Sequence, residues 1–308
     1  MATLVKKLKT INKPKPESQL VNKWTPAFYM LPAMIVMLSM VLYPFGFGVW
    51  LSFTNMSLTK FFNPDFIWFR NYLRLFQDGV IFSTFLRTII WTFTNVFFHV
   101  TIGLFLALLL NRKLPGKSIL RVLLIIPWAV PQYISALTWR SMFNYVYGAI
   151  NIALKMVGLN PINWLSDPTM TFIGAILANI WLGFPFMMMI ALGGLQSIDK
   201  SLYEAADIDG ATSLQKLKNI TLPLLKPVMT PAIILGTVWT FNQINVIILI
   251  AGGFGNEKTQ ILVTEVYRLA FNFYRYGYAA AYSVVIFLML LVFSLIYIRN
   301  TGIMKELD

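Results

Sequence analysis

The sequence predicts an all-α polytopic membrane protein with six transmembrane helices, and three observations support this fold class. Apolar residues make up 57% of the 308-residue chain and charged residues only 12%, with a mean hydropathy of +0.68, which is far more apolar than a soluble domain. All 12 acidic residues fall outside the apolar runs. Six runs are long enough to cross a hydrocarbon core, which needs about 20 residues. They cover residues 27–53, 84–110, 119–140, 171–194, 228–251 and 279–298.

The Lys and Arg residues predict the orientation in the membrane. If the N-terminus is cytoplasmic, 16 of the 25 basic residues lie inside, which agrees with the positive-inside rule and places both termini in the cytoplasm. We therefore expect a basic cytoplasmic tail at 1–26, a six-helix domain at 27–299 and a cytoplasmic C-terminal tail at 300–308. The first run is too long for a signal peptide. A basic face against anionic lipid explains the net charge of +13 without a nucleic acid partner.

Several kinds of chemistry are excluded by residue content. The chain has no cysteine, so it has neither disulfides nor a thiolate metal site. It contains no HExxH motif, paired carboxylates or nucleophile near a base, so no catalytic residue and no metal ligand is predicted and the chain is not expected to be an enzyme. The loop Asn111–Ser118 lacks the first glycine of a phosphate-binding loop, which indicates that this chain does not hydrolyse ATP by itself.

A polar segment at 195–227, between the fourth and fifth runs, predicts two short helices. Ser201 with Glu204, and Thr212 with Gln215, have the spacing of capping boxes. Gly210 suits a left-handed residue that ends the first helix, and Pro223 lacks the N–H needed to continue the second. From the residues alone, a solvated loop with two amphipathic turns is as good an interpretation as a docking surface.

Prolines predict breaks inside the membrane. Pro44 is expected to kink the first span, Pro127 and Pro131 to break the third, and Pro185 the fourth, and such breaks survive in lipid only where they are buried or line a cavity. Short helices are expected in the outer segments 54–82 and 141–170. Aromatic side chains in 54–82 fit an interfacial belt or, alternatively, a lip that contacts an external partner.

The fifth span carries the most polar cluster within the apolar runs. Amides and aromatic rings within two helical turns suit a neutral polyhydroxylated ligand, because amides bond hydroxyls and rings stack on sugar faces. Interhelical hydrogen bonding is the alternative. His99, the only histidine, is better explained as a neutral hydrogen-bonding group between helices than as a proton relay. The candidate ligand residues are Trp239, Phe241, Asn242, Gln243 and Asn245, with Tyr282 and Ser283 of the sixth span.

A family resemblance gives the polar segment a more specific interpretation. Glu204-Ala205-Ala206, then Gly210 and Ile220-x-Leu222-Pro223, resemble the cytoplasmic signature loop of permease subunits of bacterial binding-protein-dependent ABC importers. The resemblance implies a coupling helix that docks into an ATPase subunit. It assigns that contact to Glu204, Ala205, Ala206, Asp207, Asp209 and Gly210.

The six spans, Phe241-Asn242, the Gly252-Gly253 turn and Tyr278-Ala279-Ala280-Ala281 look like the carbohydrate branch of these permeases, of the maltose/maltodextrin and multiple-sugar type. The resemblance implies a multi-pass protein of the bacterial inner membrane that transports a di- or oligosaccharide. Its implied partners are a second homologous permease, two ATPase subunits that hold ATP and Mg, and an external sugar-binding protein. A permease for glycerol-phosphate or an anionic oligosaccharide, and a non-transporting assembly protein, are the alternatives.

Overall fold

The computed structural model describes residues 25–112, 114–254 and 257–301. Most of the predicted N- and C-terminal tails lies outside these residues. The chain divides into two compact units, residues 1–50 and 51–308. Within the described residues, the regular elements are helical, and strand-like pairing is limited to an isolated antiparallel bridge between Thr54 and Phe66.

The first unit holds the first apolar helix, whose α-helical geometry is interrupted where the sequence predicts it. Helix α2 (Thr25–Met37) leads into a π turn, η3 (Leu38–Leu42), and then into α3 (Tyr43–Ser52). Pro44 has no N–H to donate to residue 40, which lies inside this π turn. The missing hydrogen bond is thus absorbed by a local widening of the helix.

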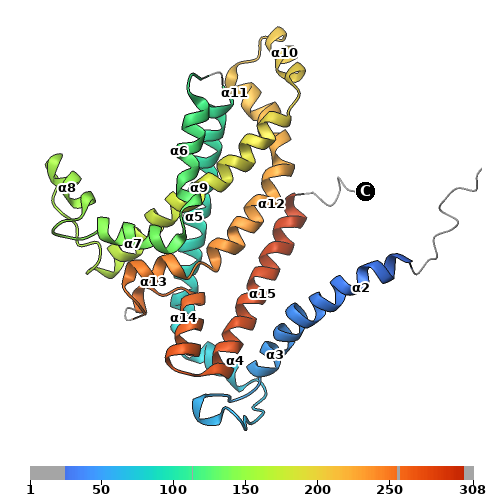
Figure 1. Ribbon diagram of the computed structural model, residues 1–308, viewed down its shortest axis with the longest axis vertical. Helices are drawn as coiled ribbons and strands as arrows, with labels where there is room; N and C mark the ends of the chain where they lie inside the picture. Colours follow the sequence, from blue (N-terminus) through green and yellow to red (C-terminus); the bar gives the residue numbers. More distant parts are fainter. Residues whose placement is uncertain (1–24, 113, 255–256, 302–308) are drawn as a thin grey trace, which may run out of the picture. The chain divides into compact units, whose positions relative to one another are not determined.

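The second unit holds the remaining helices (Figure 1). Helices α10 and α11 lie at one end, and α4 and α14 lie at the other. The described residues hold five helices long and apolar enough to cross a membrane, including the one in the first unit, and a sixth if a bent pair is counted as one span. The elements are η4 (Leu58–Lys60), α4 (Arg70–Gln77), α5 (Val80–Asn111), α6 (Lys117–Ala129), α7 (Gln132–Met142), α8 (Ala149–Met156), α9 (Pro168–Ser197), α10 (Lys200–Ile208), α11 (Ser213–Lys216), η5 (Leu217–Thr221), α12 (Leu222–Phe241), α13 (Asn245–Ala251), η6 (Glu257–Thr259), α14 (Leu262–Tyr267), η7 (Arg268–Asn272) and α15 (Tyr276–Thr301).

Helices α5 and α9 pack at the centre of this unit, and two glycines allow their close approach. A Cβ atom on Gly103 would lie 2.7 Å from the backbone nitrogen of Met188, and one on Gly183 would overlap the His99 ring. His99 is buried, and its Nε2 lies 2.9 Å from the backbone oxygen of Asn179. The expected interhelical hydrogen bond of His99 is therefore present.

The fourth span does not break at Pro185, contrary to the prediction. Helix α9 runs without interruption from Pro168 to Ser197, with Pro185 inside it. Pro185 is buried, so the protein around it can accommodate the one hydrogen bond that a proline removes. Gly183 serves a packing function against His99 instead of forming a break.

The third span breaks at its second proline, Pro131, as predicted, but Pro127 lies inside α6 and does not break it. Helices α6 and α7 are bent by 93° at Val130-Pro131. Pro131 precedes the first residue of α7, a place where a missing N–H costs little. After the bend, α7 packs against α13, and Arg140 Nη1 donates to the backbone oxygen of Leu249 at 3.1 Å.

The fifth span differs from the prediction at both of its ends. Pro223 does not stop the second short helix, because α11 continues through the π turn η5 into α12, and this turn takes up the misfit before the proline. The helix is then interrupted at residues 242–244, between α12 and α13. Asn242, Gln243 and Asn245 therefore do not lie on successive turns of one regular helix.

Candidate functional site

Helix α10 begins at a different residue from the predicted one. Its N-cap is Asp199, whose Oδ1 accepts the backbone N–H of Ser201 at 2.9 Å, so Ser201 lies inside the helix and forms no capping box with Glu204. Aspartate is as good an N-cap as serine and comes first along the chain. The bond from Ser201 also holds the pKa of the Asp199 carboxyl below its ordinary value.

The turn after α10 has the predicted glycine geometry. Gly210 has φ +74°, in the left-handed region. The N–H of Gly210 donates to the oxygen of Asp207 at 3.1 Å and that of Ala211 to the oxygen of Ala206 at 2.8 Å, which together form a Schellman motif. The next helix begins with the predicted capping box of Thr212 and Gln215. The sharp turn between the two helices is therefore encoded locally.

Two side-chain contacts connect α10 to the start of the fifth span. The Tyr203 hydroxyl lies 2.9 Å from Thr221 Oγ1, and Thr221 is buried in η5. Lys216 forms an ion pair with Asp207 across the Gly210 turn. Helix α10 is thus fixed to the membrane-spanning helix that follows it.

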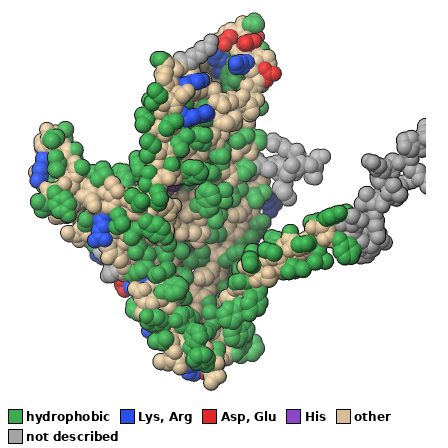
Figure 2. All heavy atoms as spheres, viewed as in Figure 1, with side chains coloured by type: hydrophobic (Ala, Val, Ile, Leu, Met, Phe, Trp, Pro, Cys, Tyr) green, Lys and Arg blue, Asp and Glu red, His purple; other side chains and the backbone are tan. Residues whose placement is uncertain are grey.

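The outward surface of this segment combines acidic and large apolar side chains. Figure 2 shows acidic side chains gathered over α10. Ile208 is 88% exposed and Leu214 72% exposed. Exposed apolar side chains rimmed by charges are typical of a surface that another protein covers. Of the predicted contact residues, Ala206 is half-buried, and Glu204, Ala205, Asp207, Asp209 and Gly210 are exposed.

A groove of about 510 Å³ between α12, α14 and α15 brings two of the predicted ligand residues together. Asn242 and Ser283 both line it. Each is oriented by its own helix, because Asn242 Nδ2 donates to Val238 O at 2.9 Å and Ser283 Oγ donates to Ala279 O at 3.1 Å. The rest of the lining is apolar except for Ser294, and none of it is charged. The groove therefore offers amide and hydroxyl groups in a neutral, mostly apolar setting.

The other predicted residues of the fifth span do not line this groove. Trp239 is 52% exposed and packs against Phe186 of α9, with ring centroids 5.2 Å apart. Phe241 is buried, whereas Gln243 and Asn245 lie at the helix break. The interruption at 242–244 changes the direction of the chain. The directions of these side chains therefore do not follow the roughly 100° per residue of a continuous α-helix.

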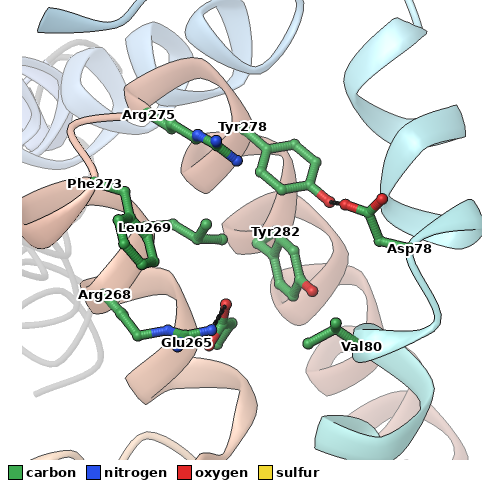
Figure 3. Close-up of a pocket in the computed structure, with 9 residues that line it drawn as sticks. All are labelled: Asp78, Val80, Glu265, Arg268, Leu269, Phe273, Arg275, Tyr278 and Tyr282. Atoms are coloured by element: carbon green, nitrogen blue, oxygen red, sulfur yellow. Dashed lines mark hydrogen bonds and ion pairs between the residues drawn. The ribbon is translucent and has the colours of Figure 1, made fainter. Parts of the chain in front are cut away.

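Tyr282 lines a different cavity, of about 190 Å³, at the end of the unit that carries α4 (Figure 3). There the hydroxyl of Tyr278 donates to Asp78 Oδ2 at 2.8 Å. Arg268 donates to both carboxylate oxygens of Glu265, at 2.9 and 3.0 Å. Sequence reasoning missed this cluster because Asp78 and Glu265 are far apart in the chain and no local spacing connects them. The described residues contain no group of three metal-ligating side chains.

Comparison with known proteins identifies the family. Residues 99–301 match the model for the binding-protein-dependent transport system inner membrane component. The chain belongs to this family. The matched region runs from His99 through the α10–α11 segment and the groove to the end of α15, so these permeases share the parts of the chain that carry both candidate sites.

Individual permeases support this membership. The chain is 39% identical to the trehalose/maltose transport system permease protein MalF of Thermococcus litoralis, over 88% of this chain and 91% of the relative. It is 34% identical to the galactooligosaccharides transport system permease protein GanP of Bacillus subtilis, over 93% and 72%. A crystal structure of a bacterial ABC transporter that imports the acidic polysaccharide alginate shares its fold, with a TM-score of 0.78, 24% identity, and coverage of 90% of this chain and 95% of that chain. A permease of this family is a multi-pass membrane component of a transporter and not an enzyme.

Proposed function

We propose that the chain is a permease subunit of an ATP-driven importer for a neutral di- or oligosaccharide of the maltose/maltodextrin type. The observation that carries this proposal is the uncharged groove, which Asn242, Ser283 and Ser294 line together with Phe287 and aliphatic side chains. Amides and hydroxyls bond sugar hydroxyls as donors and acceptors, and apolar side chains cover the C–H faces of the rings. The names of the two relatives are in line with a carbohydrate substrate.

An anionic substrate is the second candidate. A permease for glycerol-phosphate or an acidic oligosaccharide needs a cationic side chain to balance the substrate charge in a poorly solvated site. None of the ten residues that line the groove is charged, which favours the neutral substrate.

The proposal includes partners at the α10 segment and elsewhere. The exposed residues Glu204, Ala205, Asp207, Asp209 and Gly210, with half-buried Ala206, dock against an ATPase subunit, and the Tyr203–Thr221 contact transmits that docking to the fifth span. Two ATPase subunits supply ATP and Mg, a second homologous permease completes the pathway, and an external binding protein delivers the sugar. In this arrangement α10 and both termini face the cytoplasm, and the chain lies in the inner membrane of a bacterial cell.

Transport of labelled maltotriose into vesicles that contain the assembled importer tests the substrate. Asn242→Ala and Ser283→Ala should each raise the half-saturating sugar concentration about threefold to tenfold, because each removes a hydrogen bond worth about 0.5–1.5 kcal/mol. Gln243→Ala is the matched control, since this neighbouring amide does not line the groove.

Basal ATP hydrolysis should be unchanged in all three variants, because the α10 segment is untouched. Unaltered sugar affinity in Asn242→Ala and Ser283→Ala would place the sugar elsewhere. Failure of the unmodified chain to support any transport, with the importer assembled, would instead favour the assembly-protein alternative.

A further inference from the structure

A second concave site lies at the end of the 51–308 unit opposite α10, outside the groove. It has a volume of about 320 Å³, and three arginines line it: Arg70 and Arg74 of α4, and Arg275 just before α15. Tyr278 separates it from the cavity in Figure 3, where Arg275 and Tyr278 are seen on the shared wall. Neither the sugar pathway nor the α10 segment uses these arginines.

The charges in this pocket are not balanced. Arg74 lies 3.8 Å from Asp78, its i+4 neighbour, and its guanidinium stacks over the ring of Tyr278 at 5.4 Å. The Asp78 carboxylate also accepts the Tyr278 hydroxyl. Among residues 51–112, 114–254 and 257–301, neither Arg70 nor Arg275 forms a salt bridge. Three arginines therefore line the pocket and no carboxylate does, which leaves room for an anion.

The pocket is held rigid by backbone contacts from both sides. Asn71 is buried, and its Nδ2 donates to the backbone oxygens of Ser52 and Thr54, both at 2.8 Å. The N–H of Gly277 donates to Met56 O at 2.9 Å, next to Arg275. Tyr274 has φ +54°, an unusual value for a non-glycine residue, which persists only where the surroundings impose it. The backbone that carries the arginines is thus fixed before any ligand arrives.

Exposed aromatic side chains mark the level of this pocket in the membrane. Trp68 and Phe69 directly precede Arg70 and are 68% and 61% exposed, and Phe62 on the same segment is 91% exposed. Exposed Trp and Phe rings beside arginine are typical of the headgroup region, where the ring meets the apolar boundary and the cation meets phosphate. A water-filled docking surface for a soluble protein would not favour such a belt.

We propose that Arg70, Arg74 and Arg275 bind the phosphate of an anionic phospholipid headgroup. A guanidinium donates two parallel hydrogen bonds to a phosphate, and it is less strongly hydrated than an ammonium, so it binds this group well at a partly desolvated interface. The site fixes α4 and the start of α15 to the membrane surface. Through one bound lipid, it also connects the outer segment between the first and second spans to the outer segment between the fifth and sixth.

Native mass spectrometry of the full-length chain, released from nanodiscs of phosphatidylcholine with a minor fraction of phosphatidylglycerol, tests this site. The unmodified chain should retain phosphatidylglycerol, and the double variant Arg70→Gln/Arg275→Gln should lose about tenfold or more of that retention. Lys155→Gln is the matched control, because it removes an exposed cation of α8 that does not line the pocket. Equal retention in the double variant and the control would overturn the proposal.

Two further measurements separate the lipid from other anions and from misfolding. Inorganic phosphate at a concentration equal to that of the lipid should not displace phosphatidylglycerol, and displacement would assign the site to a free anion. If Arg70→Gln/Arg275→Gln does not fold, Arg70→Lys/Arg275→Lys keeps the charge but not the two-pronged geometry, and its phosphatidylglycerol retention should fall below that of the unmodified chain. Unchanged lipid retention in either double variant, with weaker docking of the external binding protein, would assign the site to a protein partner instead.

Discussion

The hydroxyl of Tyr203 on α10 lies 2.9 Å from Oγ1 of Thr221, at the π turn from which the fifth span continues. A side chain of the exposed segment thus touches a buried residue of a membrane helix directly. The two groups are 18 residues apart in sequence, and the Gly210 turn brings them together.

Tyr203→Phe should weaken the link between ATP hydrolysis and transport. The ring stays in place while one hydrogen bond of about 0.5–1.5 kcal/mol is lost. The moles of sugar transported per mole of ATP hydrolysed should therefore fall in Tyr203→Phe and in Thr221→Val. The double variant should show no larger loss than either single variant. Additive losses in that cycle would show that the contact does not act as a pair.

Substitution of Gly210 should separate backbone strain from contact with a partner. A Cβ atom at this position meets nothing within 4 Å in this chain, but φ +74° is strained for alanine by about 1–2 kcal/mol. Asparagine tolerates this conformation but is larger. If strain matters, Gly210→Asn should transport better than Gly210→Ala; if an ATPase subunit packs against Gly210, the order should reverse. Normal transport in both variants would remove Gly210 from the docking surface.

Gly183→Ala should destabilise the α5–α9 packing, because the new methyl group overlaps the His99 ring. The expected loss is about 1–3 kcal/mol, measured as a lower thermal unfolding temperature. Gly193→Ala on the same helix is the control, since its Cβ meets nothing within 4 Å. Combining Gly183→Ala with His99→Ala should cost less than the sum of the two changes, and strict additivity would contradict the proposed overlap.

Arg140→Gln should loosen α7 from α13. The guanidinium donates to Leu249 O at 3.1 Å, in the last turn of α13, where a cation also faces the negative end of the helix. Loss of a hydrogen bond from a charged group is worth about 1.5–3 kcal/mol. Thermal unfolding in detergent should shift downward, and Arg140→Lys should recover part of the shift because it keeps the charge. Equal stability of the three chains would show that packing alone holds the two helices.

Single cysteines test the orientation, since the chain has none of its own. Ile208→Cys on α10 should react with an impermeant thiol reagent only from the cytoplasmic side, because Ile208 is 88% exposed on the segment proposed to dock the ATPase. Val146→Cys, 75% exposed between α7 and α8, should react only from outside. The reverse pattern would overturn the cytoplasmic placement of α10 and of both termini.

Local signals in the sequence predicted much of this fold. The left-handed Gly210, the Thr212 capping box and the bend before Pro131 all depend on neighbouring residues, and the structure has each of them. The predicted N-cap of α10 was wrong because two suitable N-cap residues, Asp199 and Ser201, lie two positions apart. The predicted break at Pro185 was wrong because burial, which the sequence does not show, decides whether a helix continues through a proline.

The candidate groove was predictable only in part. Asn242 and Ser283 share it, but Tyr282 faces Asp78 and Glu265, and the amides at 243 and 245 follow a helix break that residue spacing does not reveal. Contacts between distant segments, such as that of Tyr278 with Asp78 and the pocket that Arg70 shares with Arg275, depend on how the helices are packed and have no local signature.

The π turn at Leu217–Thr221 accommodates one extra residue in the fifth span. Such a turn takes up one residue more than an α-helical turn, whereas each residue of a regular α-helix rotates it by about 100°. Deleting one residue from the π turn would convert it to an α-helical turn and keep Asn242 beside Ser283, but the same deletion inside α12 would swing Asn242 about a quarter-circle away. A one-residue gap at the π turn in an alignment of permeases would therefore leave the groove intact, whereas a gap within α12 would signal a remodelled groove.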